Sequence, residues 1–217
     1  MDTRGADAPV KRSLRGGLIL GAAAVVAFSL VALVHDATRD RIAASERARR
    51  VAQFDAVLGG THHDNDLLAD VTYAHDPDLL GTTSRVPVYR ARLAGQPVAA
   101  VLAPVAPDGY AGSIDLLVAI GADGKVLGVH VLRHHETPGL GDAIEERKSG
   151  WIRGFIGRSL ADPPLERWKV RKDGGDFDQF TGATVTPRAV VRAVAACLAY
   201  FRQHRDELFA APATMPT

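Results

Sequence analysis

The chain has 217 residues, enough for one domain of ordinary size plus appendages. Its 26 Lys and Arg against 25 Asp and Glu leave a formal net charge of +1, so it lacks the basic excess of a nucleic-acid-binding protein and we expect no nucleic-acid partner. The single cysteine, Cys197, excludes an internal disulfide and argues against a cysteine-based zinc or iron–sulfur site, so any redox chemistry must come from a bound cofactor.

The first predicted element is an uncharged apolar run over residues 16–34. Its length suffices for a helix that crosses a bilayer core of about 30 Å. We expect an uncleaved transmembrane helix, because the run is longer than the roughly 7 to 15 apolar residues of a signal peptide and no A-x-A site follows it. Lys11, Arg12 and Arg15 precede it, which predicts a cytoplasmic tail over residues 1–15 and an exported remainder. Five arginines beyond the run weaken this charge bias: Arg39, Arg41, Arg47, Arg49 and Arg50.

A juxtamembrane helix is expected over residues 35–58, since this segment is rich in Ala and Arg and contains no Gly or Pro. Its apolar face holds Val51, Phe54, Val57 and Leu58. Residues 61–84 have the composition of loops, with one short helical piece predicted over residues 67–71. Asp64, Asn65 and Asp66 lack the glycine and distal glutamate of a calcium loop, so we expect no metal site there.

Four β-rich runs are predicted next, over residues 86–93, 98–105, 114–120 and 126–132. Turn signals between successive runs predict hairpins and therefore an antiparallel meander. The third run is nearly all apolar, which is typical of a central strand covered on both faces. A last helix is expected from Pro187 to about Phe209, which gives an α+β fold with helices packed on an antiparallel sheet.

Two segments carry residues suited to ligand binding. In residues 134–141 (HHETPGLG), Pro138 fixes part of a loop while the two glycines free another part, so main chain can approach a flat ligand closely. His134 and His135 are adjacent on an extended segment and point to opposite faces, so we expect no metal site between them.

The second segment, residues 178–187 (DQFTGATVTP), leads into the last helix. Thr186 followed by Pro187 predicts a helix N-cap and first helical residue, which puts Thr184 just before the helix N-terminus. A phosphate at Thr184 would lie where unpaired N–H groups and the helix dipole favour negative charge. Taken alone, however, the segment is explained by a capped helix start.

A resemblance to a known family connects the two segments. Residues 178–184 resemble the Dxx(S/T)GAT flavinylation signature of the FMN-binding domain family, in which the last threonine forms a phosphoester with FMN. Residues 135–141, 109–114 and 123–125 are similar to the upstream part of that family, which implies an FMN-binding domain over residues 59–209 followed by a C-terminal tail over residues 210–217.

The resemblance implies one covalent FMN on Thr184, no catalytic residues and no metal ligands. By the same resemblance, the recognition context is Asp178, Thr181, Gly182 and Ala183, and the flavin is lined by Glu136, Thr137, Gly139 and Leu140. Tyr110, which lies among glycines in an expected binding loop, is a further candidate for flavin contact.

Within the family the chain is most similar to the G subunits of Rnf-type ion-translocating electron transport complexes. This implies an electron-transfer subunit in a bacterial inner membrane, with its domain on the periplasmic side, that works with other subunits rather than as an independent catalyst. A separate flavin transferase, using FAD and a divalent metal, would install the FMN. The C subunit of the sodium-pumping NADH:quinone reductase shares the threonine motif and is one alternative. A membrane-anchored binding or sensory domain without flavin is another.

Overall fold

The computed structural model describes residues 7–213 and divides into two units, Met1–Arg50 and Val51–Thr217. Helix α1 (Asp7–Leu58) supplies the first unit and continues into the second. It is one unbroken helix where two were expected, because no Gly or Pro interrupts residues 22–58. The part of this helix over Leu20–Leu58 contains a stretch with a mean hydropathy of 1.9, and none of that stretch is buried against the rest of the protein. In the described chain this is the one helix that could cross a membrane by length and composition, and the bounds of the span stay a prediction.

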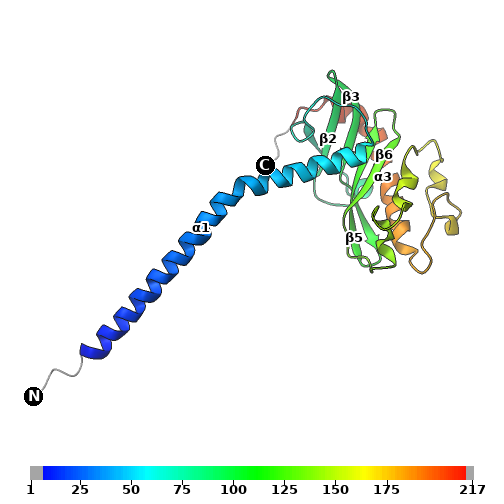
Figure 1. Cartoon of the computed structure of the whole chain (residues 1–217). Coiled ribbons are helices and arrows are strands. Elements are labelled where there is room, and N and C mark those ends of the chain that lie inside the picture. Colours follow the sequence, from blue (N-terminus) through cyan, green and yellow to red (C-terminus); the bar gives the residue numbers. More distant parts are fainter. Residues whose placement is uncertain (1–6, 214–217) are drawn as a thin grey trace, which may run out of the picture. The chain divides into compact units, whose positions relative to one another are not determined.

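The second unit is built on a six-stranded antiparallel sheet (Figure 1). Its strands are β1 (Val71–Ala74), β2 (Val86–Leu93), β3 (Gln96–Leu102), β4 (Val105–Gly109), β5 (Gly112–Gly121) and β6 (Val126–Arg133). β5 pairs with β6 on one side, and with β3 and then β4 on the other. The predicted meander is confirmed, because the four predicted runs pair in the order in which they follow one another along the chain. The single strand predicted over residues 98–105 is divided at Ala103 and Pro104, since proline has no N–H for a ladder hydrogen bond.

The prediction of a short helix over residues 67–71 was wrong. Residues 66–69 form a turn, with the Ala69 N–H donating to the Asp66 carbonyl, and β1 begins at Val71. Val71 pairs with Tyr89 of β2, so cross-strand packing decides the conformation there. A four-residue helix, α2 (Pro77–Leu80), follows β1 and is capped by the Asp76 side chain.

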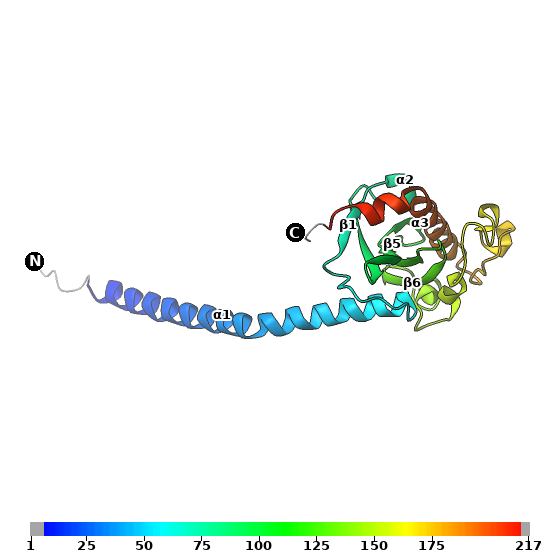
Figure 2. The ribbon, with the colours of Figure 1, turned by 90° about the horizontal axis from the view of Figure 1, so that it is seen from above.

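Both faces of the sheet are covered. Figure 2 shows helix α3 (Val185–Ala210) and the last turns of α1 on opposite sides of it. Along β5 the side chains alternate as the strand period requires: Leu116 and Val118 belong to the core under α3, whereas Leu117 belongs to the core under Phe54 of α1. The prediction of a central strand buried on both faces is therefore confirmed.

The C-terminal end of α3 is held by two arginines of β2. The buried Arg90 guanidinium donates to the Leu208 carbonyl at 3.0 Å, and Arg92 donates to the Phe209 carbonyl at 2.8 Å. Asp70 pairs with both arginines. These contacts satisfy carbonyl groups that the end of a helix leaves unpaired. Between β6 and α3 the chain forms four short 3₁₀ helices: η1 (Gly141–Ile144), η2 (Trp151–Phe155), η3 (Leu165–Arg167) and η4 (Arg171–Asp173).

Candidate cofactor site

The two chemistry-bearing segments meet at one cavity of about 370 Å³. Three stretches of chain form its wall: the β4–β5 hairpin, the loop that follows β6, and the turn that enters α3. The lining residues are Tyr110, Glu136, Thr137, Leu140, Gly141, Gly182, Ala183, Thr184, Val185 and Thr186. The volume falls in the range of about 300 to 1,000 Å³ that is usual for small-molecule and cofactor sites.

Thr184 is the residue immediately before α3, which begins at Val185. Thr184 is half-buried and lines the cavity, and its hydroxyl has no hydrogen-bond partner among the residues that the structure describes. No side chain in the described chain caps this helix, so the first N–H groups of α3 are left without a side-chain acceptor. An unengaged hydroxyl and an uncapped helix N-terminus therefore lie together in the cavity.

The prediction that Thr186 caps α3 was wrong. Thr186 is the second helical residue and Pro187 the third, a position that proline tolerates because the first four N–H groups of a helix have no partner within the helix. The Thr186 side chain is fully buried, and its hydroxyl donates to Oε2 of Glu136 rather than accepting from the helix backbone.

Glu136 is the one carboxylate in the cavity wall. It is 4 % exposed, and its Oε1 accepts from the Ala111 N–H of the β4–β5 hairpin at 3.1 Å. A Cβ at Gly109 would come within 2.8 Å of Oε1, and one at Gly141 within 2.6 Å of Oε2. The two glycines therefore leave the space that this carboxylate occupies.

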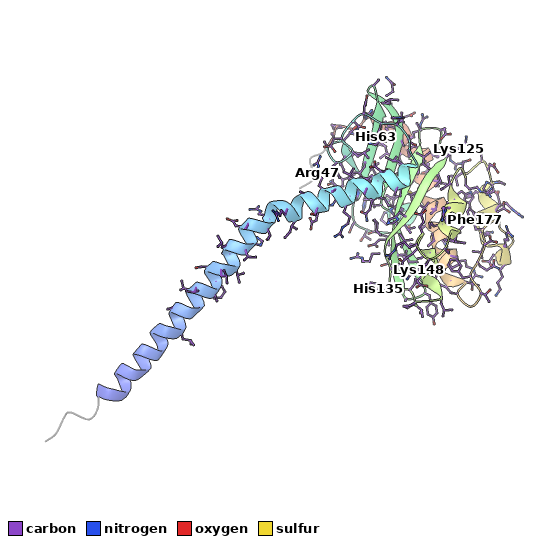
Figure 3. The ribbon with its side chains drawn as sticks, viewed as in Figure 1. Arg47, His63, Lys125, His135, Lys148 and Phe177 are labelled. Atoms are coloured by element: carbon purple, nitrogen blue, oxygen red, sulfur yellow. The ribbon has the colours of Figure 1, made fainter. Side chains whose placement is uncertain are left out.

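The loop around Gly139 is held by a charged cluster behind it. Asp142 pairs with Lys148, labelled in Figure 3, at 2.6 Å. Lys148, and after it the backbone of Gly139, lower the pKa of Asp142. Lys148 also pairs with Glu145 at 2.8 Å, and together with Arg147 and His134 it lowers the pKa of Glu145 from 4.5 to about 2. The pKa of Lys148 is raised by the same two carboxylates.

Seven of the ten predicted cofactor-binding residues line the cavity, and three do not: Asp178, Thr181 and Gly139. The Asp178 side chain is 65 % exposed and pairs with Arg171 at 3.1 Å, while its main-chain carbonyl accepts from Trp151 Nε1 at 2.8 Å. Thr181 and Gly139 are exposed. Asp178 and Thr181 therefore lie on the outer side of the turn that enters α3, outside the cavity wall.

Sequence reasoning missed five residues of the site. Gly141, Val185 and Thr186 line the cavity, and Asp142 and Lys148 hold the loop beside it. Gly141 and Thr186 belong to the two segments identified in the sequence, but the predicted role was backbone flexibility for Gly141 and helix capping for Thr186. Nothing in the local sequence distinguishes Asp142, which is buried, or Lys148 from the other charged residues of the chain.

The wall combines apolar surface with the single carboxylate. Tyr110, Leu140 and Val185 are 72 %, 47 % and 40 % exposed, which is high for large apolar side chains. Among the described lining residues there is no Lys, Arg or His. This arrangement offers a flat, largely apolar ligand the side chains of Tyr110, Leu140 and Val185, with the Thr184 hydroxyl in the same wall.

Two larger cavities, of about 700 and 610 Å³, contain none of the predicted cofactor-binding residues. The first lies between the β1–β2 connection and β4, and the second lies along β6 beside Glu145. The first cavity is also lined by hydroxyl side chains, among them Thr83 and Ser113, but neither cavity includes the start of α3.

Comparison with known proteins gives matches along nearly the whole chain. Residues 109–199 match the family model of the FMN-binding domain, and residues 1–57 match that of the RnfG N-terminal region. A Pseudomonas aeruginosa protein, named as the G subunit of an ion-translocating oxidoreductase complex, is 51 % identical over 205 residues, which cover 94 % of this chain and 96 % of that protein. A Shewanella amazonensis protein of the same name is 45 % identical over 202 residues, which cover 93 % and 94 %. The FMN-binding match includes every residue that lines the cavity.

Proposed function

We propose that this chain, which belongs to the family of G subunits of ion-translocating oxidoreductase complexes, carries one FMN bound covalently to Thr184. With this FMN it transfers electrons within such a complex. The observation that carries the proposal is the unengaged Thr184 hydroxyl at an uncapped helix N-terminus inside the cavity. A phosphoester at this oxygen would put the negative charge of the phosphate beside the first N–H groups of α3, which have no described side-chain acceptor.

The residues of the cavity fit FMN. Gly182 and Ala183 carry little or no side chain, so they leave the approach to the Thr184 hydroxyl open. Tyr110, Leu140 and Val185 offer apolar surface for the ring system. FMN supplies the electron-carrying ring when it is bound, and the protein binds it, orients it and sets its electrostatic surroundings. A covalent bond keeps the carrier in place between turnovers.

The attachment is proposed to require a separate flavin transferase. In the described chain no cluster of His, Cys, Asp or Glu residues could hold a metal ion, and the divalent metal of that reaction would belong to the transferase. The exposed side chains of Asp178 and Thr181 support a role in recognition by that enzyme, since neither lines the cavity.

The location in a bacterial inner membrane is supported by the apolar helix and by the membership in a membrane-complex family. We further propose that the domain lies on the periplasmic side, because Lys11, Arg12 and Arg15 precede the apolar run. Alkaline phosphatase fused after Thr217 should then be active in intact cells, because that enzyme matures outside the cytoplasm. An inactive phosphatase, with a fluorescent green fluorescent protein at the same position, would put the domain in the cytoplasm.

The attachment site is tested by changing Thr184→Ala in the full-length protein produced together with the flavin transferase. We expect loss of the yellow in-gel fluorescence under ultraviolet light, because the only proposed acceptor oxygen is gone. Circular dichroism should remain that of the wild type, since the side chain makes no described hydrogen bond. In the wild type, mass spectrometry of the tryptic peptide over residues 173–188 should find one flavin phosphate.

Thr83→Ala is the matched control. Thr83 is an exposed threonine between α2 and β2, outside the cavity, and this variant should fluoresce like the wild type. Fluorescence retained in Thr184→Ala would reject the attachment site. A colourless wild-type protein with an unmodified peptide would favour the alternative of an anchored binding or sensory domain.

A further inference from the structure

The buried carboxylate of Glu136 has no cationic partner among the residues that the structure describes. Its two described hydrogen-bond donors are the Ala111 N–H and the Thr186 hydroxyl. A buried charge is normally compensated by an ion pair or by a full set of hydrogen bonds. This carboxylate instead depends on donors from two other segments of the site, and each of those segments carries residues of the cavity wall.

We propose that the pair Glu136–Thr186 positions Thr184: it fixes the first turn of α3 against the cavity wall so that the Thr184 hydroxyl is presented for attachment of the flavin. This inference rests on the proposed function and goes beyond it, because it assigns a role to two residues that do not form the covalent bond. Both are positioning residues.

The geometry supports the pair as a junction. Glu136 belongs to the loop after β6, Ala111 to the β4–β5 hairpin and Thr186 to α3, so the carboxylate joins all three parts of the cavity wall. A Cβ at Gly141 would come within 2.6 Å of Oε2 of Glu136 and within 2.8 Å of the Thr186 hydroxyl, and a Cβ at Gly109 within 2.8 Å of Oε1. The two glycines therefore leave the room in which the carboxylate meets its donors.

The pair is consistent with the way α3 begins. Thr186 lies inside the helix and its hydroxyl donates to Glu136. Thr184, two residues earlier, is the N-cap residue, and its side chain makes no cap hydrogen bond. The first N–H groups of α3 therefore have no described side-chain acceptor and suit an anionic group.

The test compares Thr186→Val with Thr186→Ser in the full-length protein, produced with and without the flavin transferase. Valine keeps the shape of threonine but has no hydroxyl, so it leaves Glu136 Oε2 without its donor. Serine restores the donor. Val88→Ala is the stability control, because Val88 is buried in β2 and lines no part of the cavity.

We expect Thr186→Val to carry at least about tenfold less flavin per protein than the wild type, near the low end of the factor that corresponds to one hydrogen bond to a charged group. Thr186→Ser should recover most of it. In flavin-free protein, amide exchange over residues 188–192 should be about tenfold faster in Thr186→Val and close to the wild type in Thr186→Ser. Val88→Ala should melt at a lower temperature and still be loaded with flavin.

Two results would overturn the inference. One is wild-type loading and wild-type exchange in Thr186→Val. The other is a loss of flavin in Val88→Ala as large as in Thr186→Val, which would trace the effect to global stability. If even the wild type stays colourless, the flavin assignment fails separately, and the exchange comparison between valine and serine still decides whether the pair holds the turn.

Discussion

Two threonines at the start of α3 have opposite chemical surroundings although they are two positions apart. The Thr186 hydroxyl is buried and donates to a carboxylate, so it is neither accessible nor free to react. The Thr184 hydroxyl has no described partner and opens on the cavity. Thr184 is therefore the more accessible of the two, and burial rather than residue type makes the difference.

Lys148 provides a prediction that depends on pH. Replacing it by methionine removes the cation from both Asp142 and Glu145, so we expect a lower melting temperature at pH 7. Because Lys148 depresses the pKa of both acids in the folded protein, its contribution is full above their ordinary pKa values. It fades as pH falls from about 4.5, the ordinary value of Glu145, through about 2, its folded value. Melting curves of both proteins between pH 7 and pH 2 should therefore converge at the acid end.

Lys125→Met is the control for that experiment. Lys125 pairs with Asp123 in the β5–β6 turn at 3.3 Å, with both side chains 58 % exposed. Exposed pairs contribute little to stability, so this variant should melt like the wild type at every pH. A constant difference between the wild type and Lys148→Met down to pH 2 would show that packing of the lysine stem, not its charge, stabilises the loop.

The candidate site could be predicted from sequence where its residues lie in short motifs. The segments over residues 134–141 and 178–187 contain all the lining residues except Tyr110, because a loop and a turn present consecutive residues to one cavity. Long-range partners could not be predicted. The bond from Thr186 to Glu136 spans 50 positions, and the cap assignment failed because local pattern cannot reveal a buried acceptor so far along the chain.

At the scale of elements, sequence pattern was reliable for long runs and unreliable for short ones. β2, β5 and β6 lie where alternation and apolar content predicted them. β1, of four residues, was missed, and the start of β4, of five residues, was merged with β3. So few side chains show no clear alternation of apolar and polar residues. β1 exists through its pairing with β2, which is a tertiary contact.

Helix α3 is anchored at both of its ends by partners far along the chain. At the C-terminal end, Arg90 and Arg92 of β2 bind its last carbonyl groups. At the N-terminal end, Thr186 is bound to Glu136. The face between them is buried against the sheet. A helix held in this way gives Thr184 a defined position relative to the cavity wall, which a loop of the same sequence could not provide.

At the scale of the whole molecule, the division into two units falls inside a continuous helix. The boundary between Arg50 and Val51 assigns the last eight residues of α1 to the unit that carries the sheet. Phe54, Val57 and Leu58 are at most 4 % exposed and pack with Leu117 of β5, while a Cβ at Gly128 of β6 would come within 2.3 Å of the Val57 carbonyl. These turns are therefore part of the domain core.

A pair of truncations tests this division. A chain that starts at Val51 should be soluble and should melt cooperatively, close to the temperature of the full-length protein in detergent, because it keeps every residue of both core clusters. A chain that starts at Gly59 loses Phe54, Val57 and Leu58. Loss of one buried Phe side chain alone costs about 3 to 5 kcal/mol. The three together therefore approach the roughly 5 to 15 kcal/mol of a whole domain, so cooperative unfolding should be lost. Equal melting of the two truncated proteins, measured by circular dichroism, would contradict the assignment of the α1 end to the core.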